Sequence, residues 1–277
     1  MRLLAAVDFG ATYESVVATA GALGEALGLE PHLLHVIPDP YFQGLTHHFP
    51  ELKDPILALL DQVEARVEEA LKAQGLRAQV LRGLPAFVVG GEATRAKLVV
   101  LGQMGEAPLE RLARGGIARY LLHRGEVPVL LVPPHHPLVR PARIAVGVDE
   151  GDAALAAARL AQAFGEKLGA EVVGLHLVSG EGGCCYPTYL DPKGLGLAQV
   201  LERAEAFLGQ RLGLKVQAMK GEEASDLLEA TKRLKADLLV LGSKAKRTWR
   251  HRLGQMVEAA LRHAELPLLV VPEATRW

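Results

Sequence analysis

Short runs of apolar residues alternate along the chain with longer segments in which apolar residues recur at helical spacing. In the first half, the runs lie near residues 2–8, 31–37, 77–82, 97–102 and 127–132. Apolar residues recur at helical spacing in two segments: Val16, Val17, Ala20, Leu23 and Leu27, and then Leu60, Val63, Val67 and Leu71. Because the runs are apolar almost throughout, they indicate strands that helices cover on both faces. The pattern predicts an α/β fold with a doubly wound, five-stranded, mostly parallel sheet.

The second half of the chain repeats the first. Residues 2–8 resemble residues 143–149 at an offset of 141, and residues 98–102 match 238–242 at an offset of 140. Residues 127–133 match 266–272 at an offset of 139. Ordered matches with so small a drift indicate a tandem duplication. We therefore expect two domains of this fold, at residues 1–136 and 142–277, joined by a proline-rich linker that no helix or strand ladder continues through.

Candidate chemistry lies where strands of the first copy end. Asp8 ends the first run, and the run at 97–102 leads into a glycine-rich stretch that contains Gly102, Gly105, Gly115 and Gly116. In such sheets ligands bind beyond the carboxyl ends of the strands. Glycines let a ligand approach the backbone, and the N–H groups that open the next helix would face an anion. Glycine-rich turns also punctuate strand–helix units that bind nothing, so spacing alone leaves both interpretations open.

The spacing G-x2-G-x9-G resembles that of the universal stress protein family. Further similarities are Val7-Asp8-Phe9, Leu33-Leu34-His35-Val36-Ile37 and Gly83-Leu84-Pro85, and the resemblance covers nearly the whole chain as two family domains in tandem. It implies an ATP site, with or without Mg²⁺, in which adenine lies beside Asp8 and the main chain of Val36. It places ribose and phosphates along Gly102, Gly105, Gly115 and Gly116, with Ile117 and Ala118 next.

One departure from the family pattern falls inside this motif. The family usually has Ser or Thr where this chain has Gly116. The change removes a hydroxyl that would contact phosphate, while the backbone N–H remains. A hydrogen bond to a charged group contributes roughly 1.5–3 kcal/mol, so we expect weakened binding rather than none.

The second copy departs further, although Asp149, Gly242 and Gly254 keep family positions. Ala245 replaces the second glycine, and eight residues rather than nine separate it from Gly254. The loop is instead basic, with Lys244, Lys246, Arg247, Arg250 and Arg252. Three interpretations remain. The basic side chains bind a phosphate in place of the missing glycine backbone, or an acidic partner or RNA docks on the loop. In the third, the loop is solvated surface on a copy that binds no ligand.

Composition narrows the class of protein. The formal net charge of −1 gives no overall attraction to nucleic acid or anionic membranes, so nucleic acid is not an expected partner. No apolar run approaches the roughly 20 residues of a spanning helix, and the start reaches Asp8 too soon for a secretion signal. We expect a cytoplasmic protein without a membrane contact. Cys184 and Cys185 are adjacent, and no spaced Cys/His set predicts a metal site.

Two further residues, His35 and His176, occupy matching places in the second strand of each copy, and we expect a structural role for them. No Walker lysine accompanies the glycines, so strong ATP turnover is not expected. The resulting hypothesis is an ATP-binding regulatory module for stress response. The alternatives are a nucleotide-free interaction scaffold and a weak ATP hydrolase on the same fold. We expect the two copies to pair through their fifth strands, and the chain to be able to pair again as a homodimer.

Overall fold

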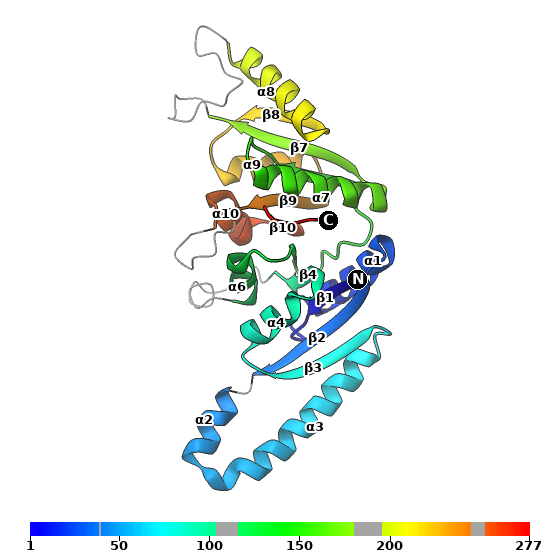
Figure 1. Ribbon diagram of the computed structural model, residues 1–277, viewed down its shortest axis with the longest axis vertical. Coiled ribbons are helices and arrows are strands. Elements are labelled where there is room, and N and C mark those ends of the chain that lie inside the picture. The colour runs from blue at the N-terminus through cyan, green and yellow to red at the C-terminus, as the bar shows by residue number, and fades with distance from the viewer. Residues whose placement is uncertain (39, 104–115, 180–195, 245–252) are drawn as a thin grey trace.

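The computed structural model describes residues 1–38, 40–103, 116–179, 196–244 and 253–277, with the backbone alone for 40–43 (Figure 1). The first repeat contains β1 (Arg2–Ala6), α1 (Tyr13–Leu27), β2 (Glu30–Pro38), α2 (Pro40–His48), a 3-10 turn η1 (Pro50–Leu52), α3 (Lys53–Lys72), β3 (Arg77–Gly83), α4 (Pro85–Ala93), β4 (Ala96–Gly102), α6 (Ile117–Arg124) and β5 (Val129–Val132). The second contains β6 (Arg143–Gly147), α7 (Asp152–Leu168), β7 (Glu171–Val178), α8 (Leu197–Leu212), β8 (Lys215–Lys220), α9 (Ala224–Arg233), β9 (Leu238–Ser243), α10 (Gln255–His263) and β10 (Leu268–Pro272).

The described strands form one sheet in the order β3-β2-β1-β4-β5-β10-β9-β6-β7-β8. Within each repeat all of these pairings are parallel, and the strand order reverses direction at the first strand of the repeat. Helices cover both faces, as the nearly continuous apolar runs predict. The predicted fold class, a doubly wound α/β sheet in each of two tandem copies, is confirmed.

Two hydrophobic cores lie on opposite faces of the sheet. On one face α1, α3, α7 and α8 bury residues such as Leu23, Leu71 and Phe164 against β-strand residues of both repeats. On the other face α4, α6, α9 and α10 do the same with Leu121 and Val257. Each core runs through both repeats, so the chain folds around a shared interior (Figure 1).

The repeats meet at β5 and β10, which pair antiparallel at the centre of the sheet. Leu130 pairs with Leu269, and these two residues are equivalent in the duplication because 127–133 matches 266–272. An approximate twofold axis therefore passes through this pair. Both leucines are 0 % exposed, and the pairing covers two strand edges that would otherwise be open.

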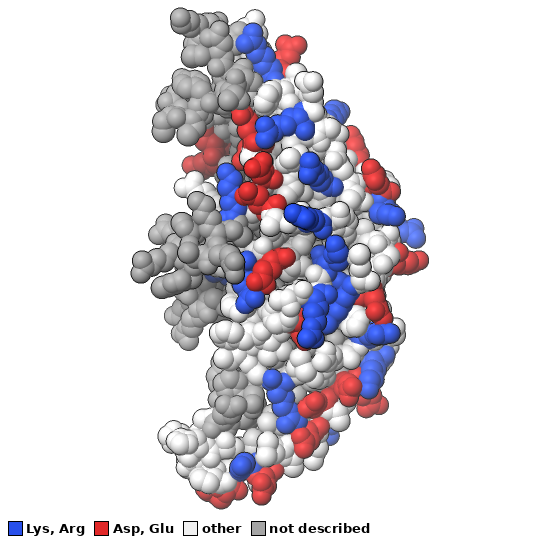
Figure 2. Space-filling model, viewed as in Figure 1, with Lys and Arg blue, Asp and Glu red and all other residues white. Residues whose placement is uncertain are grey.

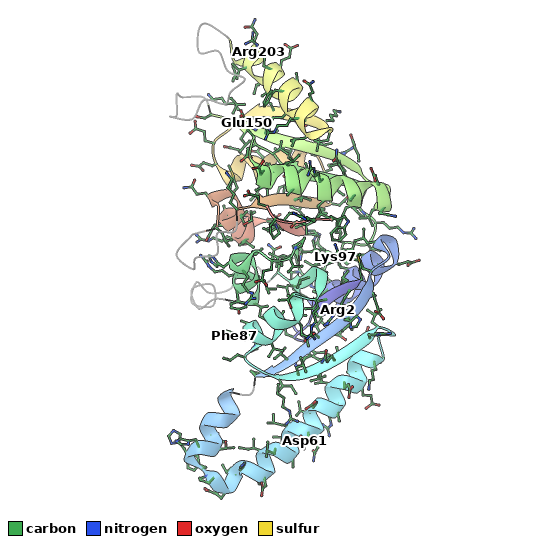
Figure 3. All side chains as sticks on the ribbon, in the orientation of Figure 1. Arg2, Asp61, Phe87, Lys97, Glu150 and Arg203 are labelled. Atoms are coloured by element: carbon green, nitrogen blue, oxygen red, sulfur yellow. The ribbon has the colours of Figure 1, made fainter. Side chains whose placement is uncertain are left out.

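Contacts outside the sheet also tie the repeats together. In the linker, the Leu138 N–H donates to Thr19 Oγ1 of α1 at 2.9 Å. Lys97 Nζ on β4 donates to the carbonyl oxygen of Arg276 near the chain end (Figure 3).

In the part of the chain that the structure describes, no helix is long and apolar enough to cross a membrane. At the far end from the second repeat, α2 and α3 project from the first (Figure 1).

Candidate functional site

A cavity of about 590 Å³ opens beyond the carboxyl ends of β1, β2 and β4 in the first repeat. This is the position at which the strand order reverses, where open α/β sheets bind ligands. Six of the eight residues proposed for the first copy line it: Asp8, Val36, Gly102, Gly116, Ile117 and Ala118. The other two, Gly105 and Gly115, lie outside the described residues.

The loop after β1 is held by short polar contacts. The Gly10 N–H donates to Asp8 Oδ1 at 2.9 Å, which turns the chain towards α1. His35 Nδ1 on β2 lies 2.8 Å from the Val7 carbonyl oxygen. Because a carbonyl can only accept, Nδ1 carries the proton and donates. His176 makes the same 2.8 Å contact with Val148 in the second repeat, which gives the repeated histidine a structural role in positioning the loop.

Packing requires a glycine at position 102, in addition to the close approach of a ligand that the sequence suggested. A Cβ at this position would lie 1.9 Å from Thr12 Oγ1, at the start of α1. A Cβ at its equivalent Gly242 would lie 2.3 Å from the Ala153 carbonyl oxygen on α7, and this helix backbone can move aside less easily than a side chain. Both glycines allow the helix after the first strand to approach the end of the fourth, which shapes the floor of each cavity.

The N-terminus of α6 faces the first cavity, and none of the described residues caps it with a side chain. The first bond inside this helix runs from the Tyr120 N–H to the Gly116 carbonyl oxygen at 3.0 Å. The N–H groups of Ile117, Ala118 and Arg119 therefore have no partner within the helix. Such donors, at the positive end of a helix dipole, favour an anion.

Most of the remaining wall is apolar and comes from the face of the sheet that α4, α6 and α10 cover. It consists of Leu34, Pro38, Pro85, Val89, Leu101, Leu131 and Leu261. A cavity with an apolar wall and a few polar groups at one side suits a ligand that has a flat apolar part and an anionic part.

Sequence reasoning missed the part of this wall that α10 of the second repeat supplies. Glu258, Leu261 and Arg262 line the first repeat's cavity together with Arg119 of α6. Arg119 Nη2 donates to Glu258 Oε1 at 2.7 Å, and Arg262 Nη2 lies 3.7 Å from Glu258 Oε2. The spacing of Glu258 and Arg262 predicts an ion pair along a helix. Nothing in it points to a cavity 139 residues earlier in the chain.

The comparison with known families decides the identity of the fold and its motif. The model of the universal stress protein family matches twice, over residues 1–133 and 142–272. The chain belongs to the universal stress protein family. The resemblance seen in the glycine spacing is thus confirmed, and so is the tandem arrangement of two family domains.

Two solved structures that span the whole chain agree on the fold of this universal stress protein. A universal stress protein from Archaeoglobus fulgidus superposes with a TM-score of 0.67 at 20 % identity, covering 99 % of this chain and 98 % of that one. A functionally unknown protein from Pseudomonas aeruginosa gives a TM-score of 0.64 at 16 % identity, covering 98 % and 92 %. A universal stress protein in complex with cAMP matches one repeat, at 21 % identity over 49 % of this chain and 99 % of that one, with a TM-score of 0.35. Among curated proteins, none matches this chain.

The second universal stress repeat has a cavity of about 760 Å³, which Asp149, Gly242 and Gly254 line. A lysine approaches the loop that carries the acidic residue. Lys244 Nζ and Asp149 Oδ1 lie 3.5 and 2.9 Å from the point that a Cβ on Gly151 would occupy. A lysine thus lies over the loop that presents Asp149. The other basic residues proposed for this loop, Lys246, Arg247, Arg250 and Arg252, lie outside the described residues.

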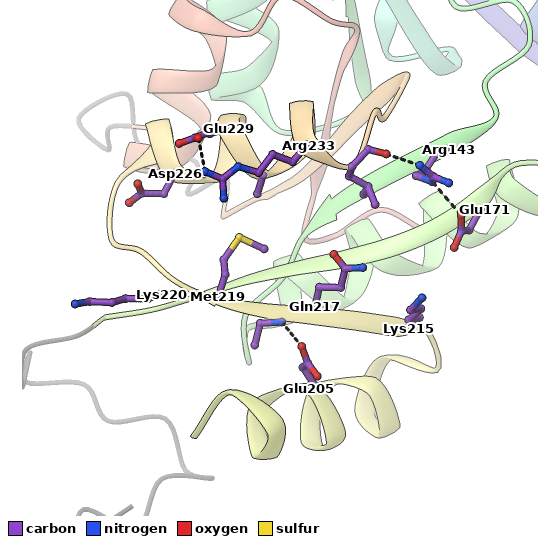
Figure 4. A pocket seen from close by; sticks show the side chains of 13 residues that line it. Arg143, Glu171, Glu205, Lys215, Gln217, Met219, Lys220, Asp226, Glu229 and Arg233 are labelled. Carbon is purple, nitrogen blue, oxygen red and sulfur yellow. Dashed lines mark hydrogen bonds and ion pairs between the residues drawn. The ribbon is translucent and has the colours of Figure 1, made fainter. Parts of the chain in front are cut away.

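A third hollow, of about 750 Å³, lies along the edge strand β8 between α8 and α9 (Figure 4). Its charged side chains are largely engaged with the protein itself. Glu205 accepts the Ala218 N–H at 2.9 Å, and Arg143 Nε donates to Glu171 at 2.9 Å. Arg233 pairs with Glu229 one helical turn away. These contacts stabilise the fold and leave little for a ligand.

Elsewhere in the described parts of the chain, a site could be marked by metal ligands or by charge of one sign. Among the described residues no group of three or more His, Cys, Asp or Glu side chains could hold a metal ion. The face drawn in Figure 2 carries positive and negative side chains interspersed, without a large patch of one sign.

Proposed function

We propose that the first repeat binds ATP, and that the chain acts in the cytoplasm as a nucleotide-binding regulatory module of the stress response without strong catalysis. The supporting observation is the cavity that brings Asp8, Val36 and Gly102 together with the uncapped N-terminus of α6. These residues are distant in sequence. They supply a polar contact, a main-chain edge, a close backbone approach and an anion site within one cavity.

The main chain of Val36 suits the edge of an adenine base. The Val7 N–H donates to the Leu34 carbonyl oxygen at 2.9 Å, so the main-chain groups of Leu34 face β1. Alternate residues of a strand present these groups to the same side. The N–H and C=O of Val36 therefore face the position beyond the end of β1. One donor and one acceptor side by side match the N1 acceptor and amino donor of adenine.

The phosphates would lie at the start of α6, because Ile117 and Ala118 present N–H groups there. Mg²⁺ would arrive with the phosphates and supply further charge neutralisation. In the second repeat Ala245 replaces the second glycine of the motif and the spacing is one residue shorter, so we expect that cavity to bind adenine nucleotides more weakly.

Calorimetric titration of the full chain with ATP, with ligand extraction from the purified protein, tests this proposal. Removing the polar contact with Asp8→Ala should weaken ATP binding roughly tenfold to a hundredfold, the equivalent of one hydrogen bond to a charged group. Asp8→Asn keeps an acceptor for the Gly10 N–H and separates the loop's geometry from the carboxylate's charge. Asp149→Ala is the matched control in the second repeat and should leave the affinity unchanged.

The outcomes separate the proposal from its competitors. Failure of the wild-type chain to bind any adenine nucleotide at millimolar concentration would contradict it and favour a nucleotide-free scaffold. ATP hydrolysis well above background with Mg²⁺ would instead favour an ATP hydrolase on the same fold.

A further inference from the structure

We propose that the second repeat completes the nucleotide site of the first, with Arg262 of α10 binding the ligand's phosphates together with Arg119 of α6. This inference rests on the proposed function, because it concerns the same cavity. Its starting observation is that α10, although part of the other repeat, contributes Glu258, Leu261 and Arg262 to the wall.

The two arginines lie on either side of one carboxylate. Arg119 Nη2 donates to Glu258 Oε1 at 2.7 Å, whereas Arg262 is 3.7 Å from Glu258 Oε2, too far for a hydrogen bond. The Arg262 side chain is 52 % exposed and that of Glu258 is 18 % exposed. Two guanidinium groups against one carboxylate leave an excess of positive charge at the wall. A guanidinium offers five N–H donors in a geometry that fits phosphate oxygens.

The position of this charge along α6 points to the phosphate end of the ligand. Arg119 is the third residue of α6, immediately after the two residues whose N–H groups open the helix. An anion at the helix start is therefore within one turn of Arg119. Glu258 holds the Arg119 guanidinium from the other repeat, which brings the α10 residues to the same place.

The duplication itself allows this asymmetric arrangement. Arg119 and Glu258 are separated by 139 residues, the offset that also relates Leu130 to Leu269 on the approximate twofold axis. Two identical copies would oppose like charges at this position. A single chain with diverged repeats can oppose an arginine and a glutamate. The first cavity thereby acquires a wall that an isolated repeat lacks.

Binding of a phosphate across this contact would link the ligand to the interface between the repeats. A ligand that binds the assembled state more tightly stabilises that state by mass action. ATP should therefore raise the unfolding temperature of the whole chain, and Arg262 should account for a part of this increase that adenosine does not produce.

Calorimetric titration with ATP and with adenosine, on the wild-type full chain and three variants, tests the inference. Arg262→Gln should weaken ATP binding about tenfold and leave adenosine binding unchanged, because adenosine has no phosphate. Glu258→Gln should have the opposite sign and tighten ATP binding several-fold, because it removes a negative charge from beside the phosphates. Arg233→Gln is the matched control: Arg233 also pairs with a glutamate one helical turn earlier, but it lies in the hollow beside β8.

The affinities of the variants for ATP and adenosine distinguish the composite site from its alternatives. ATP binding that is normal in Arg262→Gln overturns the composite site and leaves an ATP site in the first repeat intact. Equal weakening of ATP and adenosine also overturns it, because a general disturbance of the cavity would have that effect. Absence of ATP and adenosine binding in the wild-type chain overturns the proposed function and this inference with it. The unfolding temperatures of the ligand-free variants identify any variant that fails to fold. If Arg262→Gln fails to fold, the ATP affinity of Glu258→Gln decides: tighter binding supports the composite site, and unchanged or weaker binding overturns it.

Discussion

Replacing Gly116 by serine should strengthen ATP binding, because it restores the hydroxyl that the family motif usually provides. The backbone at Gly116 has φ −54° and ψ 160°, which a serine adopts without strain. A Cβ there would meet no heavy atom within 4 Å among the described residues. The substitution therefore adds a hydrogen-bonding group at the start of α6 without displacing the residues around it.

The size of the effect follows from two competing contributions. A hydroxyl donating to a charged phosphate contributes roughly 1.5–3 kcal/mol. Against this, the same hydroxyl caps α6 in the ligand-free protein, and serine exceeds glycine as a cap by only a few tenths of a kcal/mol. A net gain of about 1–2.5 kcal/mol corresponds to roughly five- to seventyfold tighter binding of ATP. The unfolding temperature of the ligand-free protein should shift by only about 1 °C.

Titration calorimetry of Gly116→Ser with ATP and adenosine checks this prediction. The affinity for ATP should rise, while that for adenosine stays as in the wild type. Gly254→Ser is the matched control, because Gly254 precedes α10 with the same φ of −54° and equal space around it. An unchanged ATP affinity in Gly116→Ser, or an equal rise in both variants, would refute the placement of phosphate at the start of α6.

Three further predictions concern the packing, the interface and a helix cap. By thermal unfolding, Gly102→Ala should destabilise the chain by about 1–3 kcal/mol, and Gly242→Ala by more, because its added methyl meets helix backbone rather than a side chain; equal losses would contradict this. In urea, Arg119→Glu should cost about 1–2 kcal/mol by opposing two carboxylates, and adding Glu258→Arg should restore most of it; no recovery would refute the pairing. The backbone N–H groups of Glu222 and Glu223 donate to the Asp226 carboxylate and lower its pKa, so its stabilising contribution is present above the unfolded pKa and is lost as pH falls through the folded one. The unfolding-temperature gap between wild type and Asp226→Asn should therefore narrow in acid, and a constant gap would contradict this.

The inner strands could be predicted from the sequence because each is a short apolar run buried on both faces. The run at 97–102 corresponds to β4 (Ala96–Gly102). The run at 77–82 corresponds to the edge strand β3 (Arg77–Gly83), in which only Val80 is fully buried. The run at 127–132 begins two residues before β5, which starts at Val129 after a proline. The helix α2 was not predicted, because Pro40–His48 contains glycine, histidines and few apolar residues at helical spacing.

The residues at the ends of single strands could also be placed, because a strand end is a local feature of the sequence. Asp8 and Gly102 line one cavity for this reason. Pairing of the fifth strands could be expected, but Arg262 could not be placed, because its position depends on how α10 packs beside α6 once β5 pairs with β10. The packing role of Gly102 against α1 was equally hidden, since it depends on a distance between two elements rather than on a pattern within one.

The number of ATP molecules bound per chain, and the repeat that binds them, test the central claim most directly. Titration calorimetry of the full chain measures the stoichiometry, and the same titration of Asp8→Ala and Asp149→Ala assigns the site. We predict one ATP per chain, with binding weakened strongly by Asp8→Ala and unaffected by Asp149→Ala. Two equivalent sites, or a single site that depends on Asp149, would contradict the account.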